Sequence, residues 1–175
     1  MSKIQAVTVM TLDGFLPETD NVLTQWAMNH KKGFVQWRER CNARILPHSI
    51  LDLLCEKDSK SDSFTYLAEV HDAESLELLR GLFHYNLVEE FIIYLFPYSA
   101  GKGISVQAIL PVRQWQLHKA VAFPNGICRL NIVILAGCNL HIARFLASCK
   151  AVIPSLFFSD KFYFSVYQRN ACVIP

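Results

Sequence analysis

The sequence predicts an α/β domain whose sheet is mixed, mostly parallel, and ends in an antiparallel hairpin. Phe64–Val70 has a strand pattern, and an amphipathic helix follows it. Glu90–Phe96 comes next and is almost continuously apolar, as in a strand covered on both faces. A strand, a helix and a strand with short joins form a parallel crossover unit. The alternating run Val112–Phe123, the turn Pro124-Asn125-Gly126 and the strand Ile127–Val133 then predict the hairpin.

Length and composition indicate one globular domain with a large core. The chain has 175 residues, 52% of them hydrophobic and 18% charged. A net charge of +2 is too small to indicate nucleic acid or an anionic membrane as a partner. The most apolar stretch, Asn131–Phe158, contains charged residues and a proline, so it does not predict a membrane span. The N-terminus lacks the pattern of a signal peptide, and the six cysteines form no regular framework. We therefore expect a cytoplasmic protein with reduced thiols.

The N-terminal third begins with a strand and continues with two helices. Ile4–Met10 is rich in β-branched residues and predicts the first strand, which Asp13-Gly14 ends as a turn. Asp20 or Asn21 can cap a helix that runs to about Asn29. A second short helix is predicted from Phe34 to Asn42, with Arg38, Glu39 and Arg40 on its solvated face.

The middle of the chain predicts short strands and one long helix. Strands are expected near Ile45-Leu46 and at Ile50–Cys55, before a polar loop over Lys57–Ser63. Asp72 should cap the long helix, whose apolar face consists of Leu76, Leu79, Leu82 and Phe83. In the hairpin, alternation places Trp115, Leu117, Val121 and Phe123 on one face and Gln114, Gln116 and His118 on the other.

Two separated motifs carry a family resemblance. Leu12-Asp13-Gly14 follows the first strand, and Pro97–Gly103 reads Pro-x-x-x-Gly-x-Gly after the strand Glu90–Phe96, with Leu87-Val88-Glu89-Glu90 upstream. In this order the motifs resemble the dihydrofolate reductase-like superfamily, and specifically the C-terminal reductase domain of bifunctional riboflavin-biosynthesis deaminase-reductases. The resemblance covers residues 1–133 and implies a three-layer αβα sandwich.

The resemblance implies an NADPH-dependent reductase of a small pteridine- or pyrimidine-like substrate, similar to 5-amino-6-(5-phosphoribosylamino)uracil reductase. Hydride comes from the cofactor, so such a site needs no protein nucleophile, and the sequence identifies no catalytic residue. The residues that would bind substrate or cofactor are Leu12, Asp13, Gly14, Gly101, Lys102 and Gly103. Taken without the resemblance, they are an ordinary Asp-Gly turn and a glycine loop with an exposed lysine. A homodimer is compatible with the resemblance.

The chain departs from the family where the cofactor's diphosphate would lie. Ala68 and Glu69 replace the usual Gly-Gly pair before the long helix, and Glu69, Asp72 and Glu74 would surround the helix N-terminus with carboxylates. A helix N-terminus attracts anions, and these carboxylates oppose that attraction. The stretch from Arg44 to Phe64 also looks too short for the adenosine side. The sequence therefore predicts a degenerate phosphate site, and the alternative function is a cofactor-free small-molecule-binding or dimerising module.

The remaining features predict no further site. Cys138, His141 and Cys149 are too few and too irregular for zinc. The tryptophans Trp26, Trp37 and Trp115 should lie in the core or a pocket wall, and His118 receives no role.

Residues 134–175 form an apolar C-terminal extension with a net charge of +3, which we separate from the domain at 1–133. Two readings of it stay open: a helix at His141–Ser148 with a strand at Phe157–Tyr167, or sequence with little structure of its own.

Overall fold

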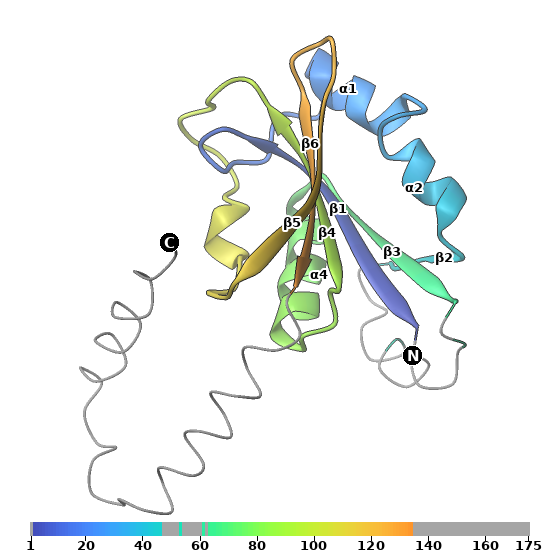
Figure 1. Ribbon diagram of the computed structural model, residues 1–175. Coiled ribbons are helices and arrows are strands. Elements are labelled where there is room, and N and C mark those ends of the chain that lie inside the picture. The colour runs from blue at the N-terminus through green and yellow to red at the C-terminus, as the bar shows by residue number, and fades with distance from the viewer. Residues whose placement is uncertain (1, 47–52, 54–60, 62, 135–175) are drawn as a thin grey trace, which may run out of the picture. The chain divides into compact units, whose positions relative to one another are not determined.

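The fold is seen in a computed structural model that describes residues 2–46, 53, 61 and 63–134. These residues lie within one compact unit, Met1–Leu135. Their strands form a six-stranded sheet in the order β2-β3-β1-β4-β6-β5 (Figure 1). The prediction of an α/β fold with a mixed sheet is confirmed.

The parallel part of the sheet is built around β1 (Lys3–Thr11), most of whose residues are buried. β1 pairs in parallel with β3 (Thr65–Val70) on one side and with β4 (Glu90–Phe96) on the other. The short β2 (Ala43–Arg44) extends the sheet beyond β3, also in parallel. The predicted bounds of these three long strands agree with the structure to within one residue.

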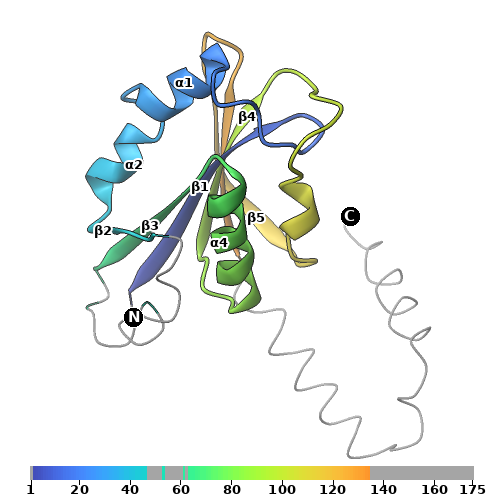
Figure 2. The ribbon, with the colours of Figure 1, turned by 180° about the vertical axis from the view of Figure 1, so that it is seen from behind.

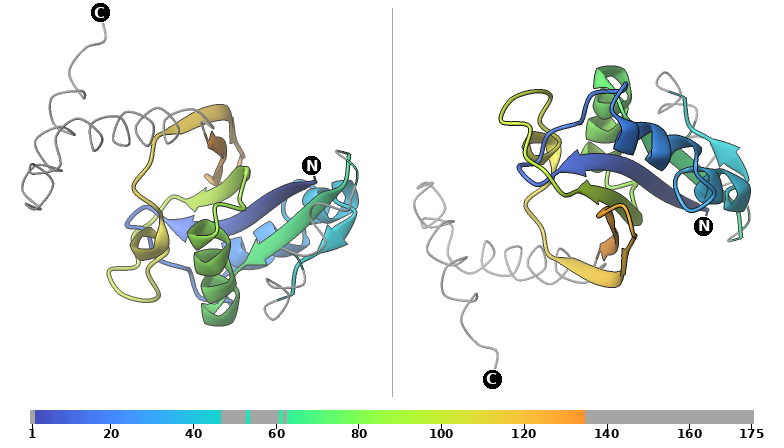
Figure 3. Two further views of the ribbon diagram at one scale, coloured as in Figure 1. Left: turned by 90° about the horizontal axis from the view of Figure 1, so that it is seen from below. Right: turned by 90° about the horizontal axis from the view of Figure 1, so that it is seen from above.

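The antiparallel part is the predicted hairpin of β5 (Trp115–Ala122) and β6 (Cys128–Ile134), with β6 paired to β4. From β3 to this hairpin the strands turn progressively, which gives the sheet its twist (Figure 3). The predicted alternation in β5 holds as far as Leu117 and is wrong beyond it, because the register shifts between Leu117 and Lys119. A bulge adds one residue and so changes which side chains face the core. Val121 consequently faces the side of the sheet opposite to Trp115 and Leu117.

Helices cover both faces of the sheet, so the three-layer arrangement is present in the described residues. α1 (Val22–Asn29) and α2 (Val35–Arg40) lie on one face, where Trp37 of α2 donates to the Tyr94 hydroxyl of β4 over 3.0 Å. α4 (Ala73–His84) lies on the opposite face, where Phe83 meets Phe91 edge to face (Figure 2). Residues of β1, β3 and β4 form the core between these layers.

Two of the predicted capping residues lie at the N-termini of α1 and α4. The Asn21 side chain accepts a hydrogen bond from the Leu23 amide at the start of α1, so Asn21 and not Asp20 is the cap. Asp72 caps α4 in a reciprocal arrangement with Ser75. Such caps satisfy amide groups that have no partner within the helix.

Two predicted boundaries and the predicted type of one element need correction. α2 ends at Arg40 and not at Asn42, because the Asn42 amide donates to Thr65 of β3 and the sheet thereby captures the chain. For the same reason the strand expected at Ile45-Leu46 lies at Ala43–Arg44. Leu53, within the strand expected at Ile50–Cys55, is helical and buried, since a short apolar run suits either element.

The rest of the strand expected at Ile50–Cys55, most of the loop over Lys57–Ser63 and both elements expected in the tail lie outside the described residues. Among the helices that the structure describes, none has the length and apolarity to cross a bilayer.

Candidate functional site

The two sequence motifs meet at the carboxyl ends of β1 and β4. The Leu12 amide donates to the Tyr98 carbonyl over 2.9 Å, and the Leu16 amide donates to the Ile104 carbonyl over 2.8 Å. Gly14 takes part through its carbonyl, which accepts from the Val106 amide over 2.9 Å. In open α/β sheets, ligands bind outside the carboxyl ends of the strands. The structure therefore brings the predicted residues together at an edge where a ligand site is expected.

Asp13 ties the two loops together. Its Oδ1 accepts from the Thr11 hydroxyl over 2.6 Å and from the Ala100 amide over 3.0 Å, while its Oδ2 accepts from the Gly101 amide over 2.6 Å. The bond from Thr11, followed by that from Gly101, lowers the pKa of Asp13 to about 2. The carboxylate is therefore ionised at neutral pH, and three hydrogen bonds within the chain already engage it.

The glycines allow the loops their shape. Gly14 has a φ of +85°, and Gly101 and Gly103 have φ values of +75° and +139°. A Cβ at Gly101 would meet nothing within 4 Å, so the backbone there is open to solvent or to a ligand. Lys102 is exposed, and Leu12 is 59% exposed. The edge thus presents backbone and small or flexible side chains, without a cluster of catalytic groups.

The predicted phosphate position is filled by the chain's own groups. Oδ1 of Asp72 accepts from the Ser75 amide over 2.8 Å and from the Ser75 hydroxyl over 2.6 Å, and Glu74 lies in the first turn of α4. Ala68 is fully buried. A cavity of only about 120 Å³ lies beside this end of the helix, and Glu69 lines it with Asp72 and Glu74. A diphosphate in the implied position would have to displace the Asp72 carboxylate, so NADPH does not fit there.

The role predicted for Glu69 needs correction, because its charge is balanced. Glu69 is 8% exposed and accepts from Nε and Nη2 of Arg38 over 2.9 and 2.6 Å. Nε of Arg44 lies 3.1 Å from Oε1 of Glu69, the same oxygen that accepts from Nε of Arg38. The bond to Glu69 also raises the pKa of Arg38. Arg38 was expected on a solvated face, and that expectation is wrong because α2 turns it towards β3.

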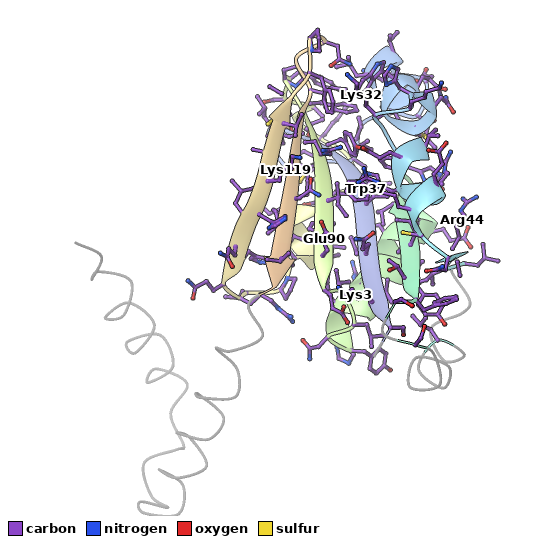
Figure 4. The ribbon with its side chains drawn as sticks, turned by 45° about the vertical axis from the view of Figure 1, so that its right-hand side comes forward. Lys3, Lys32, Trp37, Arg44, Glu90 and Lys119 are labelled. Atoms are coloured by element: carbon purple, nitrogen blue, oxygen red, sulfur yellow. The ribbon has the colours of Figure 1, made fainter. Side chains whose placement is uncertain are left out.

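A cavity that the described residues line was not predicted from the sequence. It holds about 370 Å³ on the sheet face below α2 and beside the hairpin, and none of the predicted loop residues lines it. Figure 4 looks onto this face, where Trp37, Glu90 and Lys119 come from α2, β4 and β5. A usable signal existed in the sequence: Gln5, Glu90, Arg129 and Asn131 are polar residues within otherwise apolar strands.

Hydrogen bonds join four side chains on this face into a row that crosses the sheet. The Cys41 thiol donates to Gln5, Gln5 donates to Glu90 over 2.6 Å, and Asn131 donates to the other carboxylate oxygen over 3.0 Å. Burial, followed by the charges of Glu90 and Glu69, raises the pKa of Cys41 to about 11. This thiol is therefore protonated at neutral pH and is a poor nucleophile. Within the part of the chain that the structure describes, no His, Cys, Asp and Glu group could hold a metal ion.

Comparison with known proteins finds similarity in structure only. No protein-family model and no curated protein sequence matches the chain. A proposed riboflavin biosynthesis protein from Shewanella sp. PV-4 is 12% identical, with a TM-score of 0.47 over 76% of this chain and 99% of its own. A pyrimidine reductase-like protein from Corynebacterium diphtheriae is 7% identical, with a TM-score of 0.48 over 76% of this chain and 92% of its own. Both are the kind of protein that the motifs indicated, but at these TM-scores neither likeness bears on the activity of this chain.

Proposed function

We propose that this chain is a small-molecule-binding protein that keeps the fold implied by the resemblance but does not hold NADPH as that resemblance implies. The ligand would lie at the edge formed by the loops at 12–16 and 98–104. This edge suits a small heterocycle, because it offers open backbone at Gly101 and an exposed apolar side chain at Leu12.

One observation carries the proposal. The amide groups that would meet an anionic cofactor already donate to carboxylates of the chain itself: Ala100 and Gly101 to Asp13, and Ser75 to Asp72. An anion binds to free backbone N–H groups at a helix N-terminus or a glycine loop. Here such an anion would have to break these bonds and lie beside the carboxylates that it displaced.

A titration with NADPH tests the proposal. A ligand at 100 times its dissociation constant stabilises a protein by about 2.7 kcal/mol, which a thermal-shift assay detects. We expect NADPH to leave the melting temperature of the natural chain unchanged. The double variant Glu69→Gly, Asp72→Gly should gain NADPH binding by calorimetry, because it removes the competing carboxylate and frees Arg38 and Arg44. Loss of the Asp72 cap should cost about 1 kcal/mol of stability, in addition to the cost of losing the Glu69 contacts with Arg38 and Arg44.

The control for this titration is Asp20→Asn, which removes an exposed carboxylate that caps no helix. Like the natural chain, this variant should not bind NADPH. A clear thermal shift of the natural chain with NADPH would overturn the proposal.

A second candidate is the NADPH-dependent reductase of a small pteridine- or pyrimidine-like substrate. This candidate is favoured because Asp13, Gly14 and Gly101 lie close together at the carboxyl ends of β1 and β4. Asp13 and Gly101 are 88 positions apart in the sequence. Loss of NADPH absorbance in the presence of such substrates would establish it. That assay separates the two candidates, since a binding module leaves the cofactor unoxidised.

A further inference from the structure

The cavity below α2 is lined by a buried arginine whose Nε has no hydrogen-bond partner. Arg129 of β6 is 8% exposed, and its Nε has no hydrogen-bond partner. Within the described residues its guanidinium also has no ion pair, and it lies 5.5 Å from the centre of the Trp37 ring and 5.9 Å from that of Phe123. The two rings hold the cation in place but accept no hydrogen bond in its plane. A buried guanidinium N–H without an acceptor is costly, so this position favours an acceptor from outside the chain.

A buried acceptor without a donor lies beside it. Asn131 is 5% exposed and points to the same face of β6 as Arg129, two residues away. Its amide nitrogen donates to Glu90, while its Oδ1 has no partner. The cavity therefore offers one unused cationic donor and one unused acceptor at neighbouring positions.

The charge around the cavity favours an anion. Arg40, Lys119 and Arg129 line it against the single carboxylate of Glu90, which already accepts from Gln5 and Asn131. Arg40 and Lys119 are exposed, so they can approach a ligand without first breaking a contact in the interior. The volume of about 370 Å³ suits a ligand of modest size.

We propose that this cavity is a binding site for a small oxyanion that carries its own O–H or N–H donor. The oxyanion would accept from Arg129 and Lys119, and its donor would bond to Oδ1 of Asn131. A protonated phosphate and a hydroxycarboxylate share this chemistry. The site is separate from the loop edge of the proposed function, since none of the loop residues lines the cavity.

The test uses the full chain and two pairs of matched anions, measured by calorimetry at neutral pH and constant ionic strength. Phosphate and sulfate have similar shapes, but only phosphate keeps a proton to donate at this pH. Citrate and tricarballylate differ by the citrate hydroxyl. We expect phosphate, citrate or both to bind at least threefold more tightly than the matched anion. The pair that shows this preference identifies the source of the oxyanion.

Variants assign the binding to these residues. Arg129→Gln should weaken it at least tenfold, and Asn131→Leu should abolish the preference for the anion with a donor. Arg113→Gln is the matched control, because Arg113 bonds to Asn86 and does not line the cavity. Lys119→Gln removes an exposed charge at the rim and should weaken binding about threefold even if Arg129→Gln does not fold.

Absence of binding for all four anions would overturn the proposal. Binding that Arg129→Gln and Lys119→Gln leave unchanged would overturn it as well. Because no measurement involves NADPH, these outcomes are independent of the proposed function.

Discussion

Replacing Glu69 by Gln tests whether its two arginine contacts stabilise the junction of α2 and the sheet. The change keeps the size of a side chain that is 5% exposed and removes its charge. Hydrogen bonds to charged groups contribute about 1.5 to 3 kcal/mol each, and ion pairs in solvent about 0 to 1. Arg38 is 31% exposed and Arg44 is 60% exposed, so the Arg38 contact should dominate. We expect Glu69→Gln to lower the free energy of unfolding by about 2 to 3 kcal/mol.

Urea denaturation measures this change as a lower midpoint at unchanged slope. Arg44→Gln should lose less than about 1 kcal/mol, because Arg44 is the more exposed of the two guanidinium partners of Glu69, at 60%. In a double-mutant cycle, Arg38→Gln and Glu69→Gln should show a coupling of about 1 to 3 kcal/mol. The control is Glu77→Gln, whose contact with Arg80 lies on the exposed face of α4 and should contribute under about 0.5 kcal/mol.

A loss for Glu69→Gln no larger than that for Glu77→Gln would show that the arginine contacts of Glu69 do not stabilise this junction. A negligible coupling between Arg38 and Glu69 would lead to the same conclusion, because the contact would then contribute nothing beyond its separate parts. Either result would support the prediction from the sequence that Arg38 belongs to a solvated helix face.

Three further predictions concern the loops and the chain end. Because the Thr11 hydroxyl and the Gly101 amide lower the pKa of Asp13 to about 2, below an unfolded value of about 3.9, its contribution to stability should be present above pH 4 and lost towards pH 2. The Gly101 amide resonance should titrate with a midpoint near pH 2, and Asp13→Asn should abolish that titration. Gly14→Ala should cost more than about 1 to 2 kcal/mol by denaturation, because its φ is +85° and its Cβ would lie 3.1 Å from a neighbouring side chain. Gly101→Ala, with open space around it, should cost only the backbone strain; an equal loss for both would count against the steric argument. A chain that ends after Leu135 should keep a cooperative thermal transition, and an insoluble product would make residues 136–175 part of the domain.

Local pattern was enough to predict the elements that apolar spacing and caps define. Glu90–Phe96 is observed with its predicted bounds, and Asp72 caps α4 as expected. These features depend on residues within a few positions of one another. The meeting of Asp13 with Gly101 was indicated only by the resemblance, because no local rule relates segments so far apart.

Polar partners between distant elements could not be predicted in the same way. Arg38 looked like part of a solvated helix face, yet its partner Glu69 lies 31 positions away on another element. The β5 bulge likewise depends on register with β6 and leaves no mark in the alternation of the sequence. Arg129 and Asn131 could have been noted as polar interruptions of a strand, but their lack of partners is visible only in three dimensions.

The central place of β1 in the sheet has a consequence during synthesis. β1 is made before the other strands of this sheet, and its partners β3 and β4 come much later, with Gln5 opposite Glu90. At about 5 to 20 residues per second, roughly 4 to 17 s pass between completion of β1 and completion of β4. Throughout that interval β1 has no partner strands, and an unpaired strand is prone to pair with another chain. We expect the nascent protein to depend on chaperones more than its modest size would indicate.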